Sequence, residues 1–204
     1  MKGKIMAPHA LEDLTIKEAA HLAGVAPRRI EKDCEEGIIP RRKSKLWMRK
    51  TMAAHVPMHA VAYARAMQSL DGIKMEKKSK RLVWKFLRSS KTTKFGSLEL
   101  SPGLTLHLEP LVTEVWDRTR VYLETRYEHL AVDPDILGGE PILKGTRITC
   151  QSVLGRIEGG ETLGDLVEDY PEISKEAFEV ALVYAKAHPP RGRPSAGKPW
   201  RNAA

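Results

Sequence analysis

The run DPDILGGEPILKGTRI at residues 133–148 constrains the fold of this chain more than any other segment. Glycines and prolines interrupt it between short apolar pairs, and both residue types break regular helices. The run therefore predicts two very short strands joined by tight turns. Gly145 is expected to be a turn residue, and Arg147 a conformational anchor or an ion-pair partner. The structural residues expected in this motif are Gly139, Pro141, Gly145, Thr146 and Arg147.

Three helical segments are predicted to follow this run. Thr162 and Ser174 stand at N-cap positions, where a side-chain oxygen accepts a hydrogen bond from a first-turn amide. Pro171 is expected to end the second helix. Residues 130–189 should therefore form a compact three-helix domain of helix-turn-helix-like type. The predicted helices cover residues 150–158, 162–169 and 174–187.

A second helix-turn-helix is predicted near the N-terminus. Thr15 and Glu18 have the spacing of a capping box, in which each residue satisfies a backbone amide at the start of a helix. Gly24 supplies the turn. Pro27 suits the first turn of a second helix, where its missing N–H is not needed. Residues 1–109 are expected to form this basic domain.

Two short apolar stretches predict a β-hairpin within that domain. They lie at residues 95–100 and 104–108 and flank the turn residues Pro102 and Gly103. The hairpin is a candidate for the wing of a winged helix. The expected fold class is thus mainly α with small β-hairpins. A linking helix at residues 110–129 joins the two domains, and a basic tail without fixed structure is expected at residues 190–204.

The charges of the chain are divided into three blocks. Residues 1–130 carry 25 Lys and Arg against 15 Asp and Glu, whereas residues 131–180 carry 4 against 11. Residues 181–204 carry 5 basic residues and no acid. The first block and the tail suit a polyanion such as nucleic acid, and the middle block repels one. The blocks are therefore expected to face different partners.

The basic residues of the N-terminal domain are the candidate contacts to double-stranded DNA. Arg28, Arg29 and Lys32 are expected on the outer face of the second helix, where a recognition helix meets the major groove. Arg28 or Arg29 is the candidate for a base edge, because arginine binds guanine through two hydrogen bonds. The residues expected to touch phosphates are Arg41, Arg42, Lys43 and Lys45.

Two resemblances support this organisation. The segment TIKEAAHLAGVAPRRIEKDCEEGII resembles the start of MerR-type DNA-binding domains or the related helix-turn-helix of some antitoxins. Residues 130–189 resemble the domain-of-unknown-function family numbered 433, through Pro134, Ile136 and the GTRI tetrad at residues 145–148. Many members of that family look like antitoxins of PIN-type ribonuclease toxins. The whole architecture is therefore similar to larger, two-domain VapB-type antitoxins.

Three interpretations of the basic tail stay open. An arginine of the tail would enter the acidic metal centre of a PIN-type toxin and neutralise the carboxylates that hold Mg²⁺. Alternatively, the RGRP sequence at residues 191–194 would enter an A·T-rich minor groove. The third interpretation is a solvated tail. The candidate toxin-binding residues are Arg191, Arg193, Trp200 and Arg201.

Nothing in the sequence favours catalysis. The seven histidines are scattered, and Pro57 between His55 and His59 disfavours a helical zinc site. Cys34 and Cys150 are expected to be reduced thiols of a cytoplasmic protein. No run is long and apolar enough for a membrane span. We therefore expect a protein without enzymatic activity, metal or cofactor.

The expected function is that of an antitoxin in a type II toxin–antitoxin pair. It would inhibit a cognate PIN-type ribonuclease and repress its own operon, as a homodimer or as a hetero-oligomer with the toxin. Two alternatives remain, which are a stand-alone MerR-like transcriptional regulator and the DNA-binding component of a transposition system.

Overall fold

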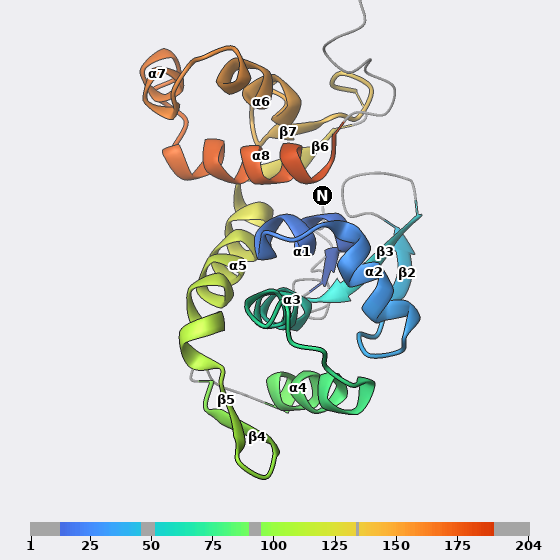
Figure 1. The fold of residues 1–204 in the computed structure, drawn as a ribbon. Coiled ribbons are helices and arrows are strands. Elements are labelled where there is room, and N and C mark those ends of the chain that lie inside the picture. The colour runs from blue at the N-terminus through green and yellow to red at the C-terminus, as the bar shows by residue number, and fades with distance from the viewer. Residues whose placement is uncertain (1–12, 46–51, 90–94, 134, 190–204) are drawn as a thin grey trace, which may run out of the picture.

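The protein is mainly helical, as predicted. The computed structural model describes residues 13–45, 52–89, 95–133 and 135–189, and these contain eight helices and three small antiparallel sheets. The sheets have two or three strands each. Figure 1 shows a lower body built from the N-terminal elements and an upper layer built from the C-terminal ones.

The N-terminal elements form a helix-turn-helix closed by a small sheet. Thr15 caps α1 by accepting a hydrogen bond from the Glu18 amide at 3.1 Å, and Gly24 ends α1 in the left-handed conformation with φ of 70°. Strands β1, β3 and β2 pair antiparallel in that order. The elements are β1 Asp13–Thr15, α1 Ile16–Ala23, α2 Pro27–Glu35, β2 Arg42–Lys45 and β3 Met52–Pro57.

The wing of this unit is the β2–β3 hairpin, which follows α2 directly in the sequence. The hairpin predicted at residues 95–108 does form, as β4 Ser97–Ser101 and β5 Leu104–His107. It lies beyond α4 at the lower end of the molecule, away from α1 and α2 (Figure 1). Its prediction as a hairpin is confirmed, but its assignment as the wing is wrong.

Three helices support the helix-turn-helix from below and from the side. They are α3 His59–Ser69, α4 Lys77–Ser89 and α5 Glu109–His129. The centre of α3 is apolar apart from the exposed Arg65, because it packs against α1, α4 and α5. Tyr63 is fully buried there, and its ring meets Trp84 of α4 edge to face, with the centroids 5.8 Å apart.

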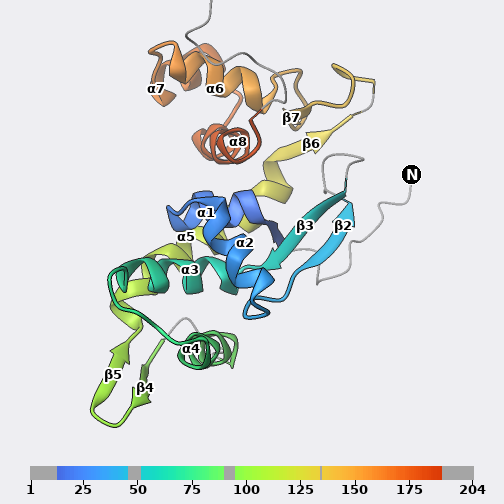
Figure 2. The same cartoon turned by 45° about the vertical axis from the view of Figure 1, so that its right-hand side comes forward.

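The C-terminal elements form a hairpin and three helices. They are β6 Leu130–Val132, β7 Pro141–Leu143, α6 Cys150–Glu158, α7 Leu163–Asp169 and α8 Lys175–Ala187. The bounds of the three helices agree with the prediction, and Thr162 and Ser174 are N-caps as expected. Helix α8 packs against α6 on one side and against α1 and α5 on the other (Figures 1 and 2). One apolar core therefore runs from Leu14 to Ala185.

Candidate nucleic-acid interface

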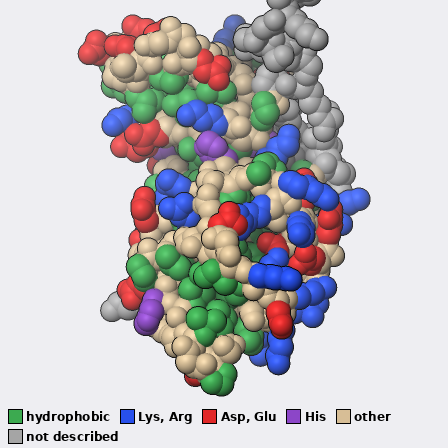
Figure 3. Space-filling view, viewed as in Figure 1, with side chains coloured by type: hydrophobic (Ala, Val, Ile, Leu, Met, Phe, Trp, Pro, Cys, Tyr) green, Lys and Arg blue, Asp and Glu red, His purple; other side chains and the backbone are tan. Residues whose placement is uncertain are grey.

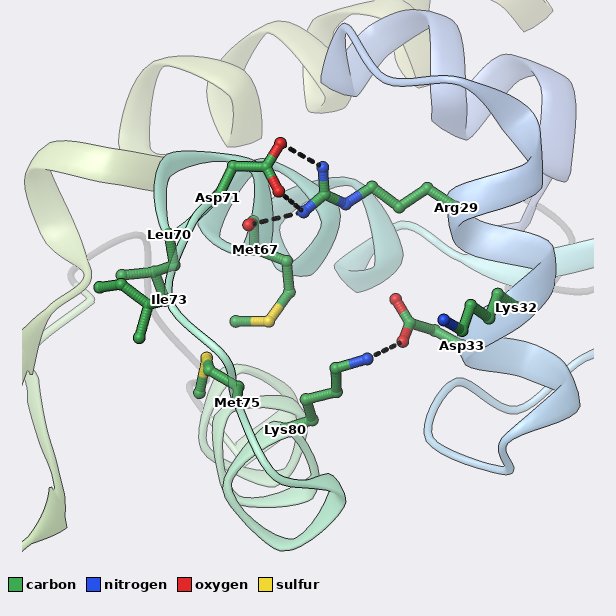
Figure 4. Close-up of a pocket in the computed structure, with 9 residues that line it drawn as sticks. All are labelled: Arg29, Lys32, Asp33, Met67, Leu70, Asp71, Ile73, Met75 and Lys80. Carbon is green, nitrogen blue, oxygen red and sulfur yellow. Dashed lines mark hydrogen bonds and ion pairs between the residues drawn. The ribbon is translucent and has the colours of Figure 1, made fainter.

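The outer face of α2 carries mixed charges. Arg28 is exposed, and its Nη1 lies 2.9 Å from Glu35 Oε1 and 3.6 Å from Glu31 Oε2. Lys32 is also exposed on this helix. Because these partners are themselves solvent-accessible, the ion pairs of Arg28 are weak and exchangeable. The face thus offers Arg28 to a ligand, next to two carboxylates, whereas Lys32 borders the cavity that Arg29 also lines (Figure 4).

Arg29 points away from this face, toward the loop between α3 and α4. Its Nη2 donates to the Met67 carbonyl at 2.9 Å and to Asp71 Oδ1 at 3.1 Å (Figure 4). Of the two arginines considered for base contact, Arg28 is therefore the one that the fold leaves available. Arg29 instead joins α2 to the end of α3.

A cavity of about 310 Å³ lies beneath Arg29, between α2, α3 and α4. Met67, Ile73 and Met75 form its apolar side (Figure 4). On the opposite side Lys80 Nζ donates to Asp33 Oδ1 at 3.1 Å. Burial raises the pKa of Asp33 against the opposing effect of Lys80. The part-buried Lys80–Asp33 ion pair and the hydrogen bond from Arg29 to the Met67 carbonyl hold α2 in place, so that its opposite face stays outward.

The candidate phosphate contacts lie on and before β2. Arg41 and Lys43 are exposed. Arg42 is exposed as well, and its Nε donates to Asp13 Oδ2 of β1 at 2.8 Å. Lys45 ends β2, and its side chain lies outside the described residues. The fold thus carries this basic segment along the wing.

A second cavity brings Arg88 to the same region. This cavity of about 280 Å³ contains residues from β1, β2, β3 and the C-terminal end of α4. Sequence reasoning missed Arg88 as a candidate, because 46 positions separate it from Arg42 and α4 carries several other basic residues. No local signal distinguishes it. The lining residues are Asp13, Pro40, Arg41, Arg42, His55, Pro57 and Arg88.

The GTRI motif of the C-terminal domain is structural at three of its positions. Gly145 has a φ of 80°, so it is the turn residue expected. The Thr146 hydroxyl donates to the Leu143 carbonyl at 2.9 Å and accepts from the Ile148 amide at 3.0 Å. Arg147 is exposed and makes no ion pair with the described residues, so its role as an anchor or ion-pair partner stays a prediction.

The other two motif residues shape the loop before β7. Gly139 has a φ of 80°, and Gly138 and Leu137 before it also have positive φ values, of 66° and 49°. Pro141 is buried and begins β7, opposite Val132 of β6. The prediction of two short strands within residues 133–148 is therefore confirmed for β7 only, because its partner β6 lies before the run at Leu130–Val132.

A buried polar cluster joins the two halves of the molecule. Arg126 of α5 donates to Glu18 Oε1 at 2.7 Å, and the Tyr122 hydroxyl donates to the same oxygen at 2.7 Å. Thr15 donates its amide and hydroxyl to Oε2. His188, at the end of α8, lies 3.4 Å from the Thr15 hydroxyl.

Glu18 is ionised within this cluster. Burial by itself raises the pKa of a carboxyl, but Arg126, His188 and the Thr15 amide outweigh it and hold the pKa of Glu18 at about 2. The carboxylate caps α1 and anchors α5 and α8 to the helix-turn-helix. Sequence reasoning found the Glu18 cap but not its partners.

The surface charges follow the predicted blocks. Acidic side chains gather over α7, whereas Lys and Arg, with acids between them, gather over α2 and β2 (Figure 3). Arg156 in α6 is paired with Glu161 and Asp169, which leaves the α7 face with excess negative charge. A polyanion would therefore meet the α2 and β2 side of the molecule.

The described residues also bear on metal sites and membrane spans. They contain no group of three or more His, Cys, Asp or Glu side chains placed to hold a metal. Within the same ranges, no helix combines the length and the apolar character that crossing a membrane requires. The candidate toxin-binding residues of the tail lie outside the described residues.

Comparisons with known proteins identify one part of the chain. The uncharacterized protein y4eO of Sinorhizobium fredii is 33% identical over 90 residues, which are 44% of this chain and 40% of that protein. The chain thus matches less than half of this relative. The crystal structure of Rv2018 from Mycobacterium tuberculosis is 15% identical, with 83% of this chain and 96% of that chain covered and a TM-score of 0.32. Residues 130–185 match the family described as "Protein of unknown function (DUF433)", and the chain therefore carries a C-terminal DUF433 domain.

Proposed function

We propose that this protein is a DNA-binding antitoxin of a type II toxin–antitoxin pair. The observation that carries the DNA-binding part is the winged helix-turn-helix, in which α2 has an outward face and a basic hairpin follows it. Two short helices with this connection place the second one in the major groove, while the wing meets the backbone. The protein would act as a repressor of its own operon, as a dimer or together with its toxin.

Within this interface the residues have different tasks. Arg28 reads a guanine in the major groove and exchanges its partners Glu31 and Glu35 for the base. Arg41 and Lys43 hold phosphates, and Lys45 lies farther along the same strand. Lys32 adds positive charge at the edge of this face, beside the cavity. Arg29 supports this face from behind through Asp71.

The antitoxin part of the proposal has a separate basis. It rests on the resemblance of residues 130–189 to a family with many antitoxin-like members, and on the negative charge of that domain, which suits a partner other than DNA. In this proposal the domain holds a PIN-type ribonuclease toxin, and Arg191, Arg193 and Arg201 of the tail reach its acidic centre. Trp200 supplies an apolar contact there.

The DNA-binding part is tested by fluorescence anisotropy with a duplex that carries the protein's own promoter. We expect tighter binding to this duplex than to a shuffled one. Arg28→Ala should remove most of this preference, and Arg65→Ala, which changes the same charge on α3, should preserve it. Equal binding of both duplexes by the unaltered protein would contradict the repressor function.

The antitoxin part is tested by co-expression with the open reading frame adjacent to its gene. We expect that frame alone to stop growth, and the pair to grow and to purify as a stable complex. Replacing Arg191, Arg193 and Arg201 together by alanine should abolish the rescue, while Lys198→Ala in the same tail should not. A harmless neighbour that does not co-purify would leave a stand-alone regulator.

A further inference from the structure

Two exposed arginines beside the wing have no carboxylate partner among the described residues. Arg41 follows Pro40 in the segment between α2 and β2, and Arg88 lies in the last turn of α4. Both side chains line the cavity of about 280 Å³. Both are exposed, and neither makes a hydrogen bond or an ion pair with the rest of the described chain. Other surface arginines, such as Arg28, Arg120 and Arg156, do have carboxylate partners.

The remaining groups of the cavity do not neutralise these two arginines. Asp13 is its one acidic lining residue among those described, and Arg42 already binds this carboxylate with its Nε at 2.8 Å. His55 is buried, and its Nδ1 lies 3.1 Å from the Ala53 carbonyl. The cavity therefore concentrates positive charge, and an anion with several oxygens is the ligand that would relieve the repulsion.

The position of the cavity indicates which anion this is. Its residues belong to the wing sheet and to the exit from α2, and Lys43 continues the basic surface along β2. A site that is continuous with the wing meets the backbone of the same duplex. A free anion such as inorganic phosphate would bind in the cavity alone and would make no contact with the wing.

We propose that Arg41 and Arg88 together form a seat for one backbone phosphate of the bound DNA, so that α4 belongs to the interface. This inference rests on the proposed DNA binding and adds a residue that the helix-turn-helix alone does not supply. Arg42 also lines the cavity, but its guanidinium binds Asp13 and so positions β2 beside the site. Arg41 and Arg88 are the main phosphate ligands in this proposal.

The test is the salt dependence of DNA binding by the full-length protein. Each phosphate contact contributes about one to the slope of log affinity against log salt concentration. We expect Arg88→Ala to lower this slope by about one and to weaken binding to specific and shuffled duplexes alike. Arg88→Lys should retain the slope. The matched control is Arg120→Ala on α5, which removes the same charge outside the seat.

Three results are distinguishable. If the unaltered protein binds promoter DNA and Arg88→Ala lowers the slope while Arg120→Ala does not, the seat is supported. If the unaltered protein binds but Arg88→Ala has the slope of Arg120→Ala, the seat is overturned and the proposed function stands. If the unaltered protein does not bind DNA, both are overturned. Arg88 is exposed, so an unchanged unfolding temperature shows that the variant is folded.

Discussion

The N-terminal winged unit and the C-terminal DUF433 domain use similar parts for different surfaces. Each has short capped helices and a small antiparallel hairpin. The first exposes Arg28, Arg41 and Arg88, and the second exposes an acidic face around α7. Local structure is therefore alike in the two regions, and what distinguishes them is the charge of their surfaces.

The two regions are nevertheless not independent. Helix α8 packs on α1 and α5, and Glu18 and Arg126 form a buried ion pair below this contact. His188, the C-cap of α8, lies 3.4 Å from the hydroxyl of Thr15, the N-cap of α1. The comparison thus teaches that the surfaces are separate while the interior is shared.

The largest expected effect comes from breaking this shared interior. Arg126→Met leaves the Glu18 carboxylate buried without its main counter-charge, which costs about 3–5 kcal/mol of the free energy of unfolding. We expect both regions to lose stability in one cooperative transition, measured by urea denaturation. The double variant Glu18→Gln with Arg126→Met should recover much of the loss, since it buries no charge. Two separate transitions would show that the regions are independent.

The next effect is a dependence on acid pH. The pKa of Glu18 is about 2 in the folded protein and near 4.5 when the carboxyl is in solvent. A depressed folded pKa means that its stabilisation is complete above the unfolded value and is lost as the pH falls toward 2. We expect the unfolding temperature to fall between about pH 4.5 and 2, and to fall less in Glu18→Gln. Identical slopes for both proteins would contradict an ionised Glu18.

The sequence predicts best those features that depend on residues a few positions apart, such as helix caps and turns. The caps at Thr15, Thr162 and Ser174 act within three residues, so the starts of their helices were predictable. The Gly145 turn is equally local, because few other residues adopt its positive φ. The same run predicted β7, but not its partner β6, which precedes the run.

What the sequence does not predict depends on distant partners. Strand β2 has no apolar alternation, since its sequence is RKSK, and it is a strand only because β3 pairs with it. The Glu18–Arg126 ion pair and the cavity that Arg41 and Arg88 both line bring together residues far apart in the chain. Arg29 was assigned to DNA by helical spacing, and its partner Asp71 in the next loop redirects it.

A smaller effect distinguishes the two faces of α2. Arg28→Ala should cost roughly 1–3 kcal/mol of discrimination between the correct and an altered operator. Arg29→Ala should leave this discrimination intact and instead lower the unfolding free energy, because Arg29 binds Met67 and Asp71. Anisotropy with paired duplexes and urea denaturation separate the two quantities. A loss of discrimination in Arg29→Ala alone would reverse the assignment.

The smallest effect tests whether a local change in the acidic C-terminal domain alters DNA binding by the N-terminal winged unit. Thr162 accepts a hydrogen bond from the Asp165 amide at 3.2 Å at the start of α7, and removing such a cap costs about 1 kcal/mol. Thr162→Ala should lower the unfolding free energy by this amount and leave promoter affinity unchanged, because α7 contacts α8 but not the winged unit. The control is Ser152→Ala in the first turn of α6, because the N-cap of that helix is Thr149 and not the Ser152 side chain. A change in promoter affinity in Thr162→Ala would mean that the acidic domain positions the DNA-binding surface as well as sharing its core.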